Sequence, residues 1–123
     1  MIQIPAQASV FVMHESVNFR NGIDGMAALA RVVLQREPMS GAFFVFRNRG
    51  RHMLRILYYD GGGFWLYYRL LEAGTFEEWK SPDASNHLTI DATELSMLLS
   101  GVSLVASRRR RKRYSQPPPE QAA

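Results

Sequence analysis

Arginine side chains are the groups in this chain whose spacing most favours a chemical role. Four of them flank a short turn between two β-rich segments and have the same parity: Arg47, Arg49, Arg51 and Arg55. Residues of one parity in a strand project from one face, so we expect their guanidinium groups to lie together. A guanidinium group binds phosphate by donating two parallel N–H hydrogen bonds to its oxygens. The pattern predicts a nucleic-acid contact, and the alternative is a solvated hairpin.

A second basic cluster lies near the C-terminus and consists of Arg108, Arg109, Arg110, Arg111, Lys112 and Arg113. Residues 1–107 carry nine Lys and Arg against ten Asp and Glu, a balance of −1, whereas residues 108–123 carry six against one, a balance of +5. The second segment has no apolar period and contains three prolines. We therefore expect a single domain over 1–107 and a disordered tail over 108–123. Such a tail suits polyanions such as DNA; the alternative is a solubilising extension.

The titratable residues do not indicate catalysis. The candidates are scattered or occupy expected caps and turns: His14, His52, His87, Asp24, Asp60 and Asp91. The glycines after Asp60 precede an aromatic strand, not the helix that a phosphate loop requires. Cysteine is absent, which excludes thiolate metal sites and disulfides. The sequence predicts a protein that is not an enzyme and binds no metal or cofactor, with a small nuclease as the minority alternative.

Aromatic side chains gather around the glycine turn: Tyr58, Tyr59, Phe64, Trp65, Tyr67 and Tyr68. Aromatic residues in strands are usually core residues, and the alternative is a platform on which bases stack.

The pattern along the chain predicts an α+β fold. Strands are expected at Ala8–Met13, Ala42–Arg47, Met53–Tyr59 and Phe64–Leu70, with a short extended piece at Val17–Arg20 and an edge strand at Thr75–Trp79. The connections 48–52 and 60–63 are too short for parallel neighbours, so the strands should form an antiparallel meander. Residues 81–87 are expected to form a polar loop.

Two helices are expected to accompany the sheet. The first is a long helix that begins at Asn21 as N-cap, with Asp24 completing a capping box, and ends at Pro38. Its apolar face repeats at helical spacing and should pack on the sheet: Ile23, Met26, Ala27, Ala30, Val33 and Leu34. The second, C-terminal helix should start with Asp91 and Glu94 and stop at Gly101. One long helix leaves the second apolar face of the sheet for the other helix or for a partner.

The N-terminal residues lack a basic leader followed by an apolar run, and no stretch of roughly 18 apolar residues occurs. The sequence therefore predicts no membrane contact and a cytoplasmic location.

Several motifs together resemble a known family. They are Phe19-Arg20, Gly22 to Gly25, Pro38 to Phe46, the basic turn Arg47 to Arg51, Tyr59-Asp60, Gly63 to Leu66, Arg69 to Glu72 and Gly74 to Phe76. In this combination the chain resembles, over roughly residues 4–102, the short accessory protein often called TnpB of bacterial insertion sequences of family sixty-six. The chain departs from the family pattern at Asn21, Met26 and Leu70, and two of these positions, Asn21 and Leu70, usually hold basic residues.

The resemblance implies a role in transposition beside a separate transposase and another element-encoded helper protein, and it supplies no catalytic residues. The expected function is therefore a non-catalytic accessory protein of transposition, a form of DNA recombination, which binds DNA or assembles with the transposase. The alternative is a protein-interaction module with an incidental basic tail and no direct DNA binding.

Overall fold

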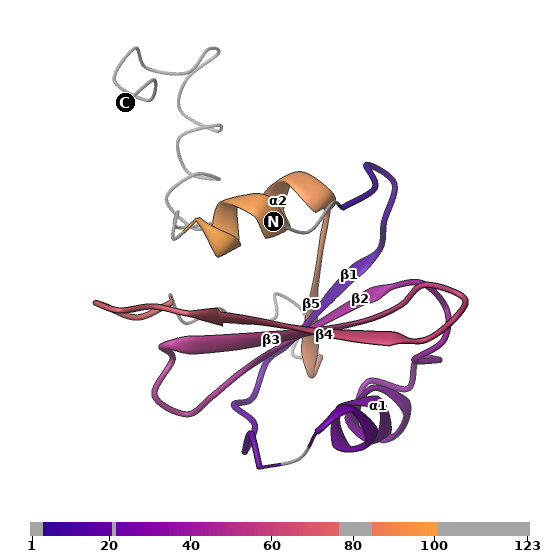
Figure 1. Cartoon of the computed structure of the whole chain (residues 1–123), viewed down its shortest axis with the longest axis horizontal. Coiled ribbons are helices and arrows are strands. Elements are labelled where there is room, and N and C mark those ends of the chain that lie inside the picture. The colour runs from indigo at the N-terminus through magenta and orange to yellow at the C-terminus, as the bar shows by residue number, and fades with distance from the viewer. Residues whose placement is uncertain (1–3, 21, 77–84, 101–123) are drawn as a thin grey trace.

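A five-stranded sheet with one helix on each face forms the fold (Figure 1). The computed structural model describes residues 4–20, 22–76 and 85–100. The elements in chain order are β1 (Val10–Met13), α1 (Ile23–Val32), β2 (Phe43–Arg47), β3 (Met53–Tyr59), β4 (Phe64–Leu70), β5 (His87–Ile90) and α2 (Ala92–Leu99). The predicted α+β class is confirmed.

The strand order is β4-β3-β2-β1-β5. The predicted meander of β2, β3 and β4 is antiparallel, as expected. The prediction of an entirely antiparallel sheet is wrong at β1, which pairs with β2 in parallel and places Val10 opposite Phe43. Residues 14–42 join these two strands, and because they include α1 they are long enough for the crossover that parallel neighbours require.

The edges of the sheet differ from the prediction. β5 pairs antiparallel with β1 at one edge, although His87 was expected to end a loop. Its two inward residues, Leu88 and Ile90, give an alternating pattern too short to signal a strand. Thr75 and Phe76 do not form the predicted edge strand, and the rest of that segment lies outside the described residues.

The segment 17–20 is not a strand either, and it ends in a turn at residues 19–20. The Val17 N–H donates to the Arg47 carbonyl oxygen at 2.8 Å. This bond fixes the segment beside the end of β2.

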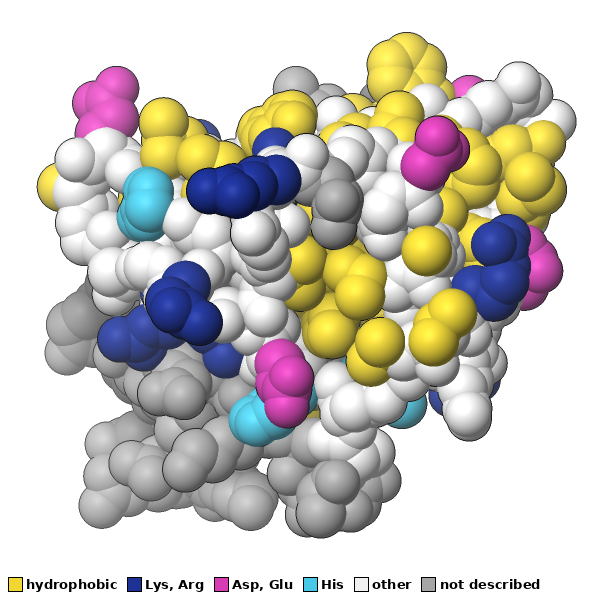
Figure 2. Space-filling model, turned by 90° about the horizontal axis from the view of Figure 1, so that it is seen from below, with side chains coloured by type: hydrophobic (Ala, Val, Ile, Leu, Met, Phe, Trp, Pro, Cys, Tyr) yellow, Lys and Arg dark blue, Asp and Glu magenta, His cyan; other side chains and the backbone are white. Residues whose placement is uncertain are grey.

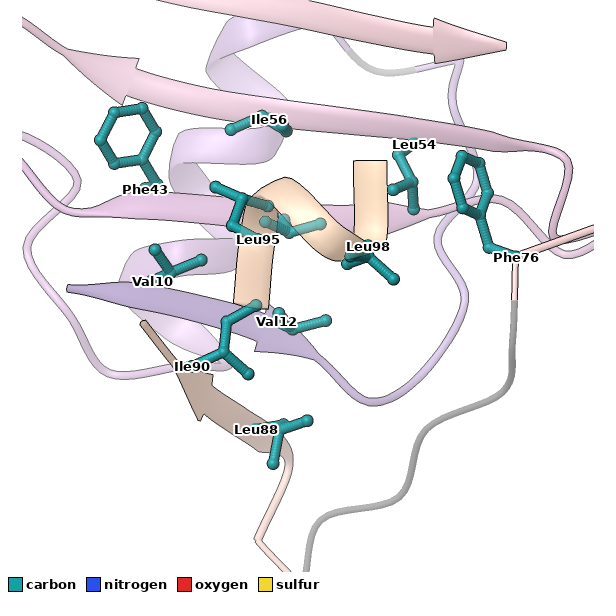
Figure 3. Packing of buried hydrophobic residues seen from close by; sticks show 11 residues of the cluster. Val10, Val12, Phe43, Leu54, Ile56, Phe76, Leu88, Ile90, Leu95 and Leu98 are labelled. Carbon is teal, nitrogen blue, oxygen red and sulfur yellow. The ribbon is translucent and has the colours of Figure 1, made fainter. Parts of the chain in front are cut away.

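Two hydrophobic cores lie on the two faces of the sheet, which explains why β2 is buried along its whole length. On the α2 face, Leu95 and Leu98 project toward the strands, where they meet Val10, Val12 and Ile56 (Figure 3). On the α1 face, the core comprises Met13, Val17, Met26, Ala27, Ala30, Leu34, Ala42, Phe44, Phe46 and Leu57. The second face is thus covered by the chain's own second helix.

The first helix is shorter than predicted. It contains ten residues and ends at Val32, well before Pro38, because Gln35 adopts a left-handed φ of 53° and the Arg36 N–H turns back to the Ala30 carbonyl. Its N-cap is Gly22, which makes no side-chain cap hydrogen bond. The predicted capping box with Asp24 is therefore not formed at this cap, and Asn21 lies outside the described residues.

The second helix begins as predicted. The Asp91 carboxylate accepts a hydrogen bond from the Glu94 N–H at 2.7 Å, and the Glu94 carboxylate accepts one from the Asp91 N–H at 3.4 Å. This capping box confirms the predicted start. The predicted stop, Gly101, lies outside the described residues.

Candidate nucleic-acid interface

The basic turn between β2 and β3 is organised by one asparagine. Asn48 Oδ1 accepts hydrogen bonds from the backbone N–H groups of His52, at 3.2 Å, and Met53, at 3.1 Å. Arg51 takes a left-handed φ of 60°, and its carbonyl oxygen accepts a bond from the Phe76 N–H. The turn is therefore ordered by bonds within it and by a bond to the chain that follows β4.

The four arginines around this turn do not share one face. Arg47 pairs with Leu54, which packs in the α2-side core, whereas Arg55 pairs with Phe46, which packs in the α1-side core. Cross-strand partners lie on the same face of a sheet, so Arg47 and Arg55 project from opposite faces. The predicted shared face is wrong because the turn of residues 48–52, with its left-handed Arg51, interrupts the alternation between the two strands.

Arg47 and Arg55 are both buried, with exposed fractions of 6% and 9%. The Arg47 Nη2 donates to the His14 carbonyl oxygen at 2.7 Å. The guanidinium carbon of Arg55 lies 4.4 Å from the ring centroid of Phe19 and 4.6 Å from that of Tyr68. Both side chains thus have structural contacts that a sequence pattern could not reveal.

A hollow of about 640 Å³ lies between the turn and residues 16–20. Arg20, Arg49 and Arg55 line it, together with the polar side chains of Ser16, Asn18 and Asn48 and with Val17, Phe19, Gly50 and Met53. None of the described residues that line it is acidic. Arg20 and Arg49 are exposed, whereas Arg55 forms part of the wall between its two aromatic neighbours. The fold therefore brings a predicted site residue, Arg49, and an unpredicted one, Arg20, to the lining of one hollow.

Arg20 was missed as a site residue because it is distant from the basic turn in the sequence. Its only sequence signal was its place in the Phe19-Arg20 motif. Figure 2 looks onto the face that carries α1 and shows several Lys and Arg side chains interspersed with hydrophobic ones. The basic side chains therefore do not form one continuous patch over this face.

The glycine turn between β3 and β4 is a hairpin, as predicted. Asp60 Oδ1 accepts bonds from the N–H groups of Gly62, at 2.8 Å, and Gly63, at 3.0 Å, and Gly61 has a φ of 97°. Asp60 Oδ2 accepts the Trp65 indole N–H at 2.7 Å. The Trp65 bond, followed by the two backbone bonds, lowers the pKa of Asp60 from its ordinary value of 3.8.

The aromatic residues divide between core and surface. Tyr58 stacks on the core residue Phe43 with ring centroids 4.3 Å apart. Trp65 and Tyr68 are 52% and 58% exposed, and Trp65 stacks on Tyr67 at 6.0 Å. The predicted core role therefore holds for part of the cluster only.

The described part of the chain contains neither a cluster of metal-binding side chains nor a membrane-spanning helix. Within residues 4–20, 22–76 and 85–100, no group of three or more His, Asp or Glu side chains could hold a metal ion. No helix in those ranges is long and apolar enough to cross a membrane. The basic residues Arg108 to Arg113 lie outside the described ranges, so their predicted role and the predicted domain boundary stay predictions.

Comparisons with known proteins place the chain in a family. The model of the family described as "IS66 Orf2 like protein" matches residues 8–109. Two relatives from Sinorhizobium fredii (strain NBRC 101917 / NGR234) are uncharacterized proteins. One, y4jC, is 33% identical over 82% of this chain and 85% of its own length; the other, y4hO, is 32% identical over 76% and 79%. No solved structure matches the chain. The chain therefore belongs to the IS66 Orf2-like family, which is associated with the transposition of insertion sequences.

Proposed function

We propose that this protein is a non-catalytic accessory protein of insertion-sequence transposition and that it contacts DNA through the basic hollow. The family membership supports the association with transposition. The observation that carries the DNA contact is the hollow itself, where Arg20 and Arg49 are exposed and the lining residues that the structure describes include no acidic one. Forked guanidinium donors bind phosphate oxygens and position a protein on nucleic acid.

The two segments of the hollow have different roles in this proposal. Arg20 and Arg49 supply the phosphate contacts, while the bond from Val17 to Arg47 holds the segment 16–20 against the sheet. Arg55 and Phe19 shape the wall of the hollow. The Arg-rich residues 108–113 add phosphate contacts that do not depend on sequence. The transposase and the element's other helper protein are the protein partners we expect beside the DNA.

A second candidate function is a protein-interaction module without direct DNA binding. Exposed apolar side chains on β4 favour it: Trp65, Tyr68 and Leu70 are all more than half exposed. Exposed aromatic residues commonly anchor protein interfaces. The two functions differ in their response to salt, because phosphate contacts release counterions and apolar contacts do not.

Fluorescence anisotropy of labelled duplexes tests the proposal. The full chain should bind both duplexes that carry the element's ends and scrambled duplexes. Its affinity for each should fall as the salt concentration rises. The double variant Arg20→Ala and Arg49→Ala should bind more weakly, and its slope of log affinity against log salt should be shallower by roughly 0.9 for each phosphate that is no longer neutralised.

The matched control is Arg31→Ala, which removes an exposed arginine of α1 outside the hollow lining. Its binding should fall less than that of the double variant. If the full chain shows no salt-sensitive affinity for DNA, or if the double variant and the control bind equally, the DNA contact is wrong and the interaction module is the better account.

A further inference from the structure

The edge strand β4 combines an open backbone with exposed apolar side chains. Within the described ranges its one neighbour in the sheet is β3 (Figure 1). Trp65, Tyr68 and Leu70 are 52%, 58% and 55% exposed, and β4 contains one charged residue, Arg69. A strand of seven residues without proline is long for an unprotected edge.

The hydrogen-bond phase of the hairpin shows which backbone groups face outward. The Asp60 N–H bonds to the Gly63 carbonyl oxygen and the Leu71 N–H bonds to the His52 carbonyl oxygen. With the register of β3 on β4, the hydrogen-bonded pairs then include Trp65, Tyr67 and Arg69, because such pairs alternate along an antiparallel ladder. The outward backbone groups belong to the intervening residues, Phe64, Leu66, Tyr68 and Leu70.

We propose that β4 pairs antiparallel with β4 of a second copy of this chain, about a two-fold axis at Tyr67. In this register Phe64 bonds to Leu70 of the second copy, and Leu66 bonds to Tyr68. All outward backbone groups of the strand then find partners. An isologous contact of this kind closes on itself and gives a dimer with one continuous sheet.

The side chains of this register are complementary in charge and shape. Trp65 stands opposite Arg69 of the second copy in a non-hydrogen-bonded pair, where side chains approach closely. The guanidinium group meets the indole ring, which is fixed by its bond to the exposed, ionised Asp60 carboxylate. The positive Arg69 thus faces an aromatic ring and a negative charge, and the two copies of Arg69 stay apart.

The existing contact of Arg69 is compatible with this arrangement. Its Nε donates to the Leu99 carbonyl oxygen at 3.2 Å, and the terminal nitrogens of a guanidinium group provide further donors. On the other face, Leu66 lies opposite Tyr68 and adds apolar contact. A shift of the register by one pair toward the C-terminus would shorten the overlap and place Arg69 opposite Tyr67, away from Asp60.

Cross-linking tests the register directly, because the native chain has no cysteine. In the full chain carrying Tyr67→Cys, the two cysteines would stand opposite each other with Cα atoms about 4.5 Å apart, within the range that a disulfide requires. Mild oxidation should yield covalent dimers. The control Thr89→Cys places an exposed cysteine on the opposite edge strand and should yield few. Thermal melting checks that both variants fold.

Sedimentation over a range of concentrations, without DNA, gives the second measurement. The parent chain should dimerise, Arg69→Glu should weaken dimerisation by roughly tenfold or more because it brings a carboxylate toward Asp60, and Thr89→Glu should match the parent. A chain that stays monomeric at every concentration overturns the proposal. So does a dimer in which the folded Tyr67→Cys variant cross-links no better than Thr89→Cys, or one that Arg69→Glu leaves unchanged.

Discussion

Asp60 shows how one carboxylate orders both a turn and an exposed aromatic ring. It accepts hydrogen bonds from the N–H groups of Gly62 and Gly63 and from the Trp65 indole. These donors favour the ionised form, so the pKa of Asp60 lies below 3.8 in the folded chain. These hydrogen bonds therefore stabilise the folded chain fully above the pKa that Asp60 has in the unfolded chain. Their contribution is lost as the pH falls through the lower pKa of the folded chain.

We predict that the indole N–H resonance of Trp65 moves with a midpoint below pH 3.8, since the resonance reports the carboxylate that accepts its bond. NMR titration measures this midpoint, and Trp65→Phe assigns the resonance. Asp60→Asn should abolish the transition. A midpoint at or above 3.8 would contradict the prediction.

The arginines near the basic turn should differ in how much they contribute to the free energy of unfolding. Arg55→Ala removes two cation–π contacts, with Phe19 and Tyr68, and should lower the free energy of unfolding by roughly 1 kcal/mol or more per contact. Arg49→Ala alters an exposed side chain and should change that free energy by less than about 0.5 kcal/mol. Chemical denaturation compares the two variants. If the two variants were equally stable, the contacts of the buried Arg55 side chain would contribute nothing to the free energy of unfolding.

At the scale of elements, the two helices differ in how they begin. The α2 cap is reciprocal, whereas the Gly22 cap of α1 makes no side-chain hydrogen bond. Asp91→Ala should destabilise the protein by about 0.5–2 kcal/mol, as expected for the loss of a cap. Asp24→Ala should have a smaller effect, limited to about 0.3–1 kcal/mol from the helix dipole. Urea denaturation tests the order, and an Asp24 variant as destabilised as the Asp91 variant would refute it.

The face of α1 that was predicted from its periodicity is confirmed in part: Met26, Ala27, Ala30 and Leu34 are buried, whereas Ile23 is exposed. Ala30 is fully buried against the sheet, whereas Val32 is 72% exposed. Ala30→Asp should prevent folding, because an unpaired buried charge costs at least several kcal/mol. Val32→Asp introduces the same charge at the surface and should melt close to the parent. Circular dichroism distinguishes these results. Val33, a predicted core position, is half-buried and would give a weaker test.

For the whole molecule, the charge division between residues 1–107 and 108–123 predicts separate contributions to DNA binding. Deletion of residues 108–123 removes a balance of +5. It should weaken binding to every duplex about equally and flatten the salt dependence by up to roughly 0.9 for each phosphate that the tail neutralises. Anisotropy at several salt concentrations measures both effects. A truncated chain with unchanged affinity and slope would show that the tail makes no phosphate contact.

The sequence predicted the elements whose signals are local. The strands β3 and β4 and the Asp91 capping box are as expected, because alternation, turn glycines and cap residues act over a few neighbouring positions. The early end of α1 was missed, since Gln35 in a left-handed conformation carries no such signal. The strand β5 was missed because four residues show too little alternation.

Contacts between distant segments were decided by the tertiary structure alone. The parallel pairing of β1 with β2 follows from the path of residues 14–42 back across the sheet. The same path brings Arg20 to the hollow that Arg49 also lines, and the turn between β2 and β3 places Arg47 and Arg55 on opposite faces. The sequence by itself determined which residues are basic and where the hairpins turn. Which arginines are exposed depends on packing across the whole sheet, because burial is set by neighbours that are remote in the chain.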